Sequence, residues 1–143
     1  MFLVTLKMSN INSEKLNFIL ESTKSYKHNG KQFFDHLLQT SGIVEKLCQQ
    51  IGIEDSKYLV DAALFHSIYG TDYYEFNEQI TREKVISLIG ENAEKLVHFF
   101  CSLPERNIQI LQHKFQPSLQ RDLYILEYAN LLELSITDVQ KTS

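Results

Sequence analysis

The chain of 143 residues has little cysteine, proline or glycine: two, two and five residues respectively. Cys48 and Cys101 stand alone and match neither a disulfide framework nor a cysteine-based metal site. We expect both to be small core residues in a reducing compartment. The composition is otherwise ordinary, 43% hydrophobic and 22% charged, and it indicates one folded domain over residues 1–143.

Long apolar runs are also lacking. No stretch approaches the length of a membrane span. The apolar residues 1–7 are too few for the core of a signal peptide and have no basic leader. These absences exclude a membrane protein and favour a cytoplasmic one. Residues 1–10 are expected either to be a loose N-terminal arm or to include an upstream start, because Met8 directly precedes a better helix start.

The sequence has no excess of basic residues. It carries 14 Lys and Arg against 18 Asp and Glu, a net charge of -4. The basic residues are scattered rather than gathered on one stripe, so the pattern expected for binding a phosphate backbone is missing. Nucleic acid is therefore excluded as a partner.

Helical periodicity is present throughout, and no alternating strand pattern or internal repeat accompanies it. Glycines and Pro104 separate the periodic segments. Helices are expected over residues 13–25, 31–51, 56–68, 81–88, 92–102, 104–115 and 119–134. The sequence thus predicts an all-α fold, a single bundle of about seven helices.

Polar residues occupy positions that this arrangement would bring together. His28 precedes the second expected helix, His36 lies on its first turns, and His66 is near the end of the third; Asn130 lies in the apolar stripe of the last. Imidazole is the commonest metal ligand and carries protons near neutral pH. An unpaired buried polar group costs about 1–3 kcal/mol, which favours a shared site. For each histidine taken singly, a structural role is favoured, and the prediction of a site rests on several polar residues occupying such positions together.

Several motifs resemble the HD-domain superfamily of helical metal-dependent phosphohydrolases. His36 and His66 lie on consecutive helices with 29 residues between them, and residues 128–133 (Tyr-Ala-Asn-Leu-Leu-Glu) are similar to the late helix that carries the final Asp ligand there. A small HD-like family of unknown function is more similar still. That resemblance covers His-Asn-Gly-Lys-Gln-Phe-Phe-Asp-His-Leu at 28–37, Leu-Phe-His-Ser-Ile-Tyr-Gly-Thr at 64–71, Thr-Arg-Glu at 81–83 and Gly-Glu-Asn-Ala-Glu at 90–94. It implies a single HD-like helical bundle.

The chain departs from the HD pattern at Ser67 and Asn130, where the superfamily has Asp, and both changes remove a negative charge. Two interpretations stay open. In the first, His28, His36 and His66 bind a divalent transition metal (Zn, Fe or Mn), and the site hydrolyses a small phosphorylated compound. In the second, no metal binds, and the chain is a non-catalytic module for a small-molecule ligand or a protein partner.

Further side chains are expected to complete the site. Tyr69 and Thr71 follow His66 with a glycine between them, and they would either present hydroxyls to a ligand or only end a helix. The expected catalytic residues are His66, Tyr69 and Arg82, the expected ligand-binding residues are Lys31, Thr71 and Asn130, and the expected metal ligands are His28, His36 and His66.

Other charged and aromatic residues carry weaker expectations. Arg106 is a further candidate for binding an anion. We expect Asp35 and Asp61 to face water, and Glu94 to be favourable near a helix start through the helix dipole alone. The aromatic residues of 73–76 are expected to pack on the core or to form the surface of a homodimer.

Overall fold

The computed structural model describes residues 12–24, 30–70 and 79–142, and the regular structure in these ranges is entirely helical. The helices are α2 (Ser13–Thr23), α3 (Gly30–Ile51), α4 (Lys57–Leu64), α5 (Arg82–Ser102), α6 (Arg106–Leu111) and α7 (Pro117–Thr142). The predicted all-α class is confirmed for this part of the chain. No helix within it combines the length and the apolar character needed to cross a membrane. The expected N-terminal arm lies outside the described residues.

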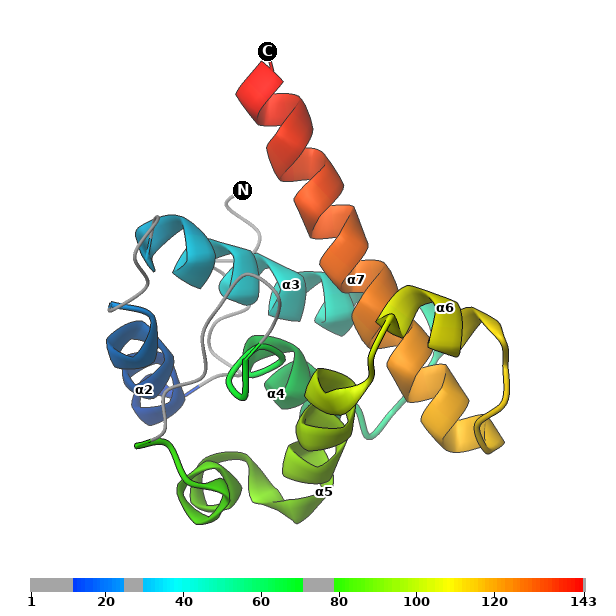
Figure 1. The fold of residues 1–143 in the computed structure, drawn as a ribbon, viewed down its shortest axis with the longest axis horizontal. Coiled ribbons are helices and arrows are strands. Elements are labelled where there is room, and N and C mark those ends of the chain that lie inside the picture. The colour runs from blue at the N-terminus through cyan, green and yellow to red at the C-terminus, as the bar shows by residue number, and fades with distance from the viewer. Residues whose placement is uncertain (1–11, 25–29, 71–78, 143) are drawn as a thin grey trace.

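Helix α4 lies at the centre of the fold and packs against α3, α5 and α7 (Figure 1). All six residues from Leu59 to Leu64 are buried. A helix that is apolar around most of its circumference is stable only when neighbours cover every side. This constraint explains why the short, apolar α4 is surrounded by other helices.

The helix ends follow the local sequence signals. The Asn12 side chain caps α2 by accepting a hydrogen bond from the Lys15 backbone N–H at 3.0 Å, and Thr81 caps α5 in the same way. Gly52 follows α3 with a φ of +81°, a conformation that glycine adopts without strain. These ends match the predicted ones to within one or two residues.

Helix α5 contains a sharp break at Gly90, where φ is +86° and ψ is 166°. The sequence predicts two helices here, one ending near Leu88 and the next starting near Asn92. The structure joins them into one kinked element, so the described residues hold six helices where the sequence predicts about seven. Gly90 permits the break because a residue with a Cβ would be strained at this φ.

The third expected helix, 56–68, is too long. Helix α4 stops at Leu64, and residues 65–69 form turns. At this point His66 Nδ1 donates to the Ala63 carbonyl oxygen at 2.7 Å, and the His66 backbone N–H donates to the same oxygen. In a continuing helix that oxygen would accept from the backbone N–H four residues later. The backbone hydrogen bonds beyond α4 instead join residues three apart.

Helix α7 is longer than expected and starts at Pro117, because proline fits the first turn of a helix, where no N–H partner is needed. Helix α6 is shorter than the expected 104–115. Glu105 before it adopts a left-handed φ of 46°, so the helix cannot extend back to Pro104. In Figure 1 the C-terminal end of α7 extends beyond the other helices.

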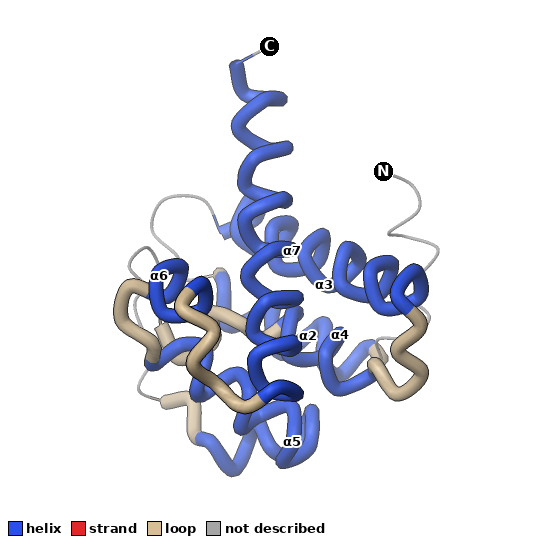
Figure 2. The backbone as a smooth tube through the Cα atoms, turned by 90° about the vertical axis from the view of Figure 1, so that its right-hand side faces the viewer, coloured by secondary structure: helices blue, strands red, loops and turns tan. Residues whose placement is uncertain are grey.

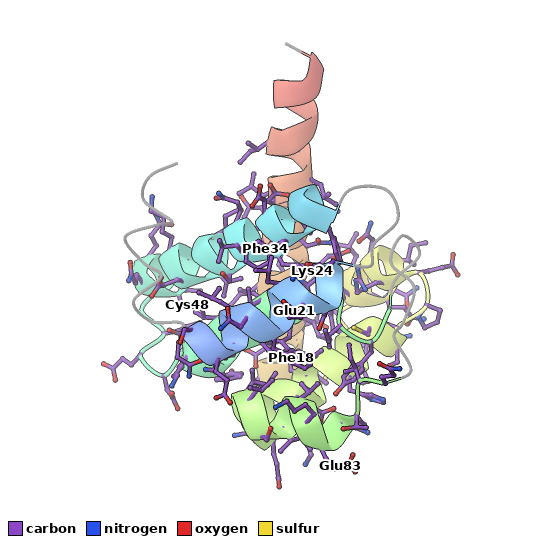
Figure 3. The ribbon with its side chains drawn as sticks, turned by 90° about the vertical axis from the view of Figure 1, so that its left-hand side faces the viewer. Phe18, Glu21, Lys24, Phe34, Cys48 and Glu83 are labelled. Atoms are coloured by element: carbon purple, nitrogen blue, oxygen red, sulfur yellow. The ribbon has the colours of Figure 1, made fainter. Side chains whose placement is uncertain are left out.

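Helix α2 packs on the core through the buried Ile19, an aromatic contact and an ion pair. Figure 3 shows α2 across the front of the molecule beside α3, and the Phe18 ring stacks on Phe65 at 5.9 Å. Lys15 Nζ lies 3.0 and 2.9 Å from the two carboxylate oxygens of Asp61, and both side chains are 5% exposed. The expectation that Asp61 faces water is therefore wrong. Burial raises the pKa of Asp61, and Lys15 offsets only part of this effect.

Lys15→Met tests this ion pair. The substitution leaves the Asp61 carboxylate buried without its partner, which lowers the free energy of unfolding by about 3–5 kcal/mol. Adding Asp61→Leu should restore most of the loss. Urea unfolding at neutral pH measures all three proteins. Lys24→Met, which breaks an exposed pair with Glu21 on the same helix, is the control, and a Lys15→Met variant that loses no more than this control would contradict the assignment.

Candidate functional site

The structure brings three predicted site residues together from separate elements: His36 on α3, His66 in the turns after α4, and Asn130 on α7. Asn130 Oδ1 lies 2.9 Å from His36 Nε2 and 3.1 Å from His66 Nε2. The two imidazole rings meet edge to face with 5.3 Å between their centroids. We call these three residues the His–Asn cluster.

The His66 ring is 2% exposed and has a fixed tautomer. Its Nδ1 faces the Ala63 carbonyl oxygen, which only accepts, so Nδ1 carries the hydrogen. Burial, followed by the influence of His36, lowers the pKa of His66 to about 3. The ring is therefore neutral near pH 7, and its Nε2 presents a lone pair to Asn130. Cys101 Sγ donates to the His66 carbonyl oxygen at 3.0 Å and holds the turn in place.

The His36 ring is oriented by Glu133 on α7, whose carboxylate accepts a hydrogen bond from Nδ1. Both side chains are largely buried. Glu133 is not among the predicted site residues, although it follows Asn130 by three residues and therefore shares its helix face. Asp35 is exposed, as expected. With Nδ1 committed to Glu133, His36 directs Nε2 at Asn130.

The Asn130 amide is oriented by Glu127. Asn130 Nδ2 donates to Glu127 Oε1 at 3.2 Å, and since a carboxylate only accepts, the amide oxygen must face the histidines. Arg106 Nε donates to the same Glu127 oxygen at 3.3 Å. The Arg106 guanidinium also lies 4.0 Å from the centroid of the Phe100 ring. Arg106, expected as an anion-binding residue, is thus engaged in holding this network.

The His–Asn cluster consequently brings acceptors together. His66 Nε2 and Asn130 Oδ1 both present lone pairs across 3.1 Å, and His36 Nε2 does the same when its ring is neutral. Acceptors at this separation repel each other unless a hydrogen or a cation lies between them. A protonated His36 satisfies its own contact with Oδ1 but leaves the His66 contact without a hydrogen. A hydrogen or a cation between these atoms would remove the repulsion.

A second polar cluster is centred on Glu94 and includes Tyr69, which follows His66 by three residues. Glu94 is buried and accepts hydrogen bonds from the Tyr69 hydroxyl at 2.8 Å and from Arg82 Nε and an Arg82 terminal nitrogen at 2.7 and 2.9 Å. The dipole-only expectation for Glu94 is wrong, because two side chains bind it directly. Burial and the bond to Glu94 raise the pKa of Tyr69, so its phenol stays protonated.

The structure does not describe the side chains of three other predicted site residues, His28, Lys31 and Thr71. His28 and Thr71 lie outside the described residues, as do residues 73–76, and the side chain of Lys31 in the first turn of α3 is not described either. Ser67 is buried. In the described part of the chain, no three His, Cys, Asp or Glu side chains are grouped to hold a metal. The third donor of the His–Asn cluster is an amide.

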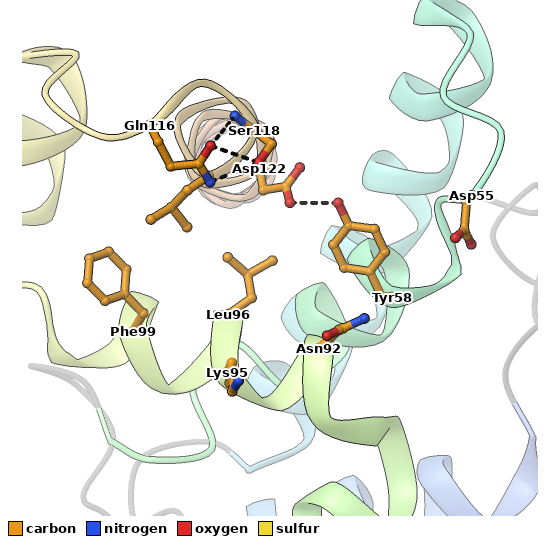
Figure 4. Close-up of a pocket in the computed structure, with 10 residues that line it drawn as sticks. Asp55, Tyr58, Asn92, Lys95, Leu96, Phe99, Gln116, Ser118 and Asp122 are labelled. Carbon is orange, nitrogen blue, oxygen red and sulfur yellow. Dashed lines mark hydrogen bonds between the residues drawn. The ribbon is translucent and has the colours of Figure 1, made fainter.

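A cavity of about 560 Å³ lies between α4, α5 and the start of α7 (Figure 4). Leu96, Phe99 and Leu119 form its apolar side, and the Tyr58 hydroxyl donates to Asp122 Oδ2 at 2.6 Å on its polar side. Burial, then Asp122, raise the pKa of Tyr58 to about 12. No member of the His–Asn cluster lines this cavity, so the two features are separate, and the sequence analysis did not anticipate the cavity.

The comparisons with known proteins give one match. A family model described as a domain of unknown function (DUF6817) matches residues 19–105, a span that includes His36 and His66 but not Asn130. No curated protein and no solved structure matches the chain. Nothing in these results links the chain to the HD superfamily.

Arg82→Gln tests the second cluster through its pH dependence. Burial alone would raise the pKa of Glu94, but the hydrogen bonds from Arg82 and Tyr69 outweigh it and hold the pKa below its ordinary value of 4.5. A carboxyl with a lowered folded-state pKa stabilises the protein above its unfolded-state pKa, and this contribution disappears as the pH falls through the folded-state value. The variant should therefore be less stable than wild type near neutral pH, and the difference should narrow in acid.

Urea unfolding from about pH 7 down to about pH 3 measures this difference. Lys24→Gln, which breaks the exposed pair with Glu21, should change little at any pH. A constant difference between Arg82→Gln and wild type over the whole range would mean that Glu94 does not depend on Arg82 for its charge.

Proposed function

Because the chain belongs to the DUF6817 family, described as a domain of unknown function, we propose its function from the His–Asn cluster itself. The chain is a divergent HD-like protein in which His36, His66 and Asn130 bind a divalent transition metal (Zn, Fe or Mn) and a small phosphorylated compound is hydrolysed. One observation carries the proposal. Two imidazole nitrogens converge on one amide oxygen at 2.9 and 3.1 Å, with the second nitrogen of each ring already bonded elsewhere.

The spacing of the donors is suitable for a metal. Transition metal ions hold nitrogen and oxygen ligands at about 2.0–2.2 Å, so two ligand atoms at right angles around one ion are about 3 Å apart. The separations from Asn130 Oδ1 to His36 Nε2 and His66 Nε2 are of this size. An ion would turn two repulsive contacts between lone pairs into ligand bonds.

Each donor also has the outer partner that metal ligands usually have. Glu133 orients His36, the Ala63 carbonyl orients His66, and Glu127 orients Asn130. Ser67 and Asn130 lack the negative charge that Asp has at these positions in the HD pattern. The carboxylates of Glu127 and Glu133 supply negative charge one hydrogen bond further out, against the single positive charge of Arg106. This balance offsets part of the charge of a divalent ion.

A bound divalent ion would polarise a phosphoryl oxygen and make a water molecule more acidic. Tyr69 and Arg82 would orient the phosphorylated substrate, because the Arg82 side chain is 48% exposed and an anion can reach it. His28 as an additional ligand, and Lys31 and Thr71 as ligand contacts, remain predictions on unplaced residues or side chains. We place the protein in the cytoplasm because Cys48 and Cys101 carry free thiols.

The alternative is a non-catalytic module that binds a small molecule or a protein without a metal. Two observations favour it. The positions that hold Asp in the HD pattern hold neutral Ser67 and Asn130, and His66 is too deeply buried to meet a large substrate directly. In this case a protonated His36, paired with Glu133, would supply the hydrogen that Asn130 Oδ1 accepts.

Metal content separates the two functions. Protein purified without chelators should contain about one equivalent of a transition metal by elemental analysis, and His36→Ala His66→Ala should contain less than about a tenth of that. His113→Ala, which removes an exposed histidine outside the cluster, is the matched control and should keep the metal. Circular dichroism checks that the variants fold.

The same proteins are then assayed on a set of small phosphate esters. Metal-dependent hydrolysis that is lost in the double variant supports the enzyme. A metal-loaded protein without hydrolysis keeps the metal site and removes the hydrolase. Wild-type protein with no more metal than the double variant would contradict the metal site and favour the alternative.

Asn130→Asp adds the missing carboxylate. Without metal, the new charge lies beside the Glu127 carboxylate, now 3.2 Å from Asn130 Nδ2, and the variant should have a lower Tm than wild type. Added Zn²⁺ should raise its Tm by more than it raises the wild-type value, because a charged ligand binds the ion more strongly. Asn92→Asp, at an exposed position on α5, should show no such gain. Equal Zn²⁺ shifts in all three proteins would exclude Asn130 as a ligand.

A further inference from the structure

The exposed side of α7 lacks charge over three turns. From residue 124 to 136 the exposed side chains are Tyr124, Tyr128, Leu131, Leu134, Ser135 and Ile136. We call four of the large ones, Tyr124, Tyr128, Leu131 and Leu134, the α7 outer face; each is 42% to 49% exposed. Ile136 projects from another side of the helix, because two residues span about 200°. The chain as a whole is 22% charged. Loss of charge together with enrichment in tyrosine is the composition of a protein interface.

The spacing of these residues forms a continuous surface. Tyr124, Tyr128 and Leu131 are four and three residues apart, so they lie in one stripe along the helix. The opposite side of α7 carries the buried Leu123 and Leu126. A helix that is apolar on both sides is normally covered on both. Figure 2 shows α7 crossing the face turned to the viewer, with no other described helix over most of its length.

The area is sufficient for a stable contact. At these exposures the four side chains present roughly 350 Å² of mostly apolar surface, given 150–250 Å² for a whole aromatic side chain. Apolar atoms make up about 60% of a typical interface, so the complete contact would bury about 600 Å² per partner, at the lower end of the range for stable interfaces. Ile108 and Leu111 on the adjacent α6 are also more than half exposed.

We infer that the α7 outer face is the interface of a homodimer, in which two α7 helices pack antiparallel about a two-fold axis. A second copy fits because the surface carries no charge, so pairing it with itself brings no like charges together in a chain of net charge -4. Antiparallel packing places the projecting end of each helix, with Leu134, against Tyr124 of the other copy. This surface differs from residues 73–76, and the dimer does not depend on the metal.

The full-length protein should therefore have twice the mass of one chain in size-exclusion chromatography with light scattering, and it should dissociate on dilution. Tyr128→Glu Leu131→Glu should have the mass of one chain, because each carboxylate would be buried in the contact without a partner. Its circular dichroism should match wild type, since both side chains point away from the core. Leu20→Glu, at an exposed apolar position on α2, should stay dimeric.

Two results would overturn the inference. If the wild-type protein is monomeric from micromolar to millimolar concentration, the α7 outer face is not a homodimer interface and would instead bind a different protein. A Tyr128→Glu Leu131→Glu variant that remains dimeric would place the dimer contact elsewhere on the molecule. Metal analysis of the monomeric variant keeps this test separate from the proposed function, because its His–Asn cluster is unchanged.

Discussion

The hydrogen bond from His66 Nδ1 to the Ala63 carbonyl oxygen links the end of α4 to the His–Asn cluster. It forms where α4 stops at Leu64 and the backbone hydrogen bonds change to residues three apart, and it stabilises the turn that follows. It also fixes the tautomer of a neutral, buried imidazole and directs Nε2 toward α7. A single contact therefore stabilises the turn after the central helix and creates an acceptor pointing at Asn130.

Helix α7 supplies Asn130 and the two carboxylates that orient the cluster, all from one face. Glu127, Asn130 and Glu133 follow each other at intervals of three residues and are all buried. Arg106 holds Glu127, Glu127 orients the Asn130 amide, and Glu133 orients His36. The Glu127 and Glu133 carboxylates bond to the neutral donors Asn130 and His36 and are not donors of the cluster themselves. An ion at the His–Asn cluster would thus be attracted by charges that do not bind it directly, which makes a site with His, His and Asn electrostatically reasonable.

Much of the fold could be predicted from local signals, because they act within one turn of helix. Thr81 as an N-cap and Asn130 in an apolar stripe are of this kind. Features that depend on distant partners could not be predicted. Asp61 is buried because Lys15, 46 residues away, pairs with it, and no local pattern indicates this. The helix containing His66 is predicted too long because its apolar periodicity continues beyond Leu64, where the His66 side chain already donates to the Ala63 carbonyl oxygen.

The two faces of α7 connect the cluster to the proposed dimer. Asn130 lies between Tyr128 and Leu131 in sequence, with its amide turned inward and their side chains outward. Beyond Leu134 the helix projects past the other described helices (Figure 1), so these helices give its end little support. Packing against a second copy would order the helix from its other side. Because the donor spacing of a metal site tolerates only small displacements, a contact that steadies α7 also steadies the position of Asn130 Oδ1 against the two histidines.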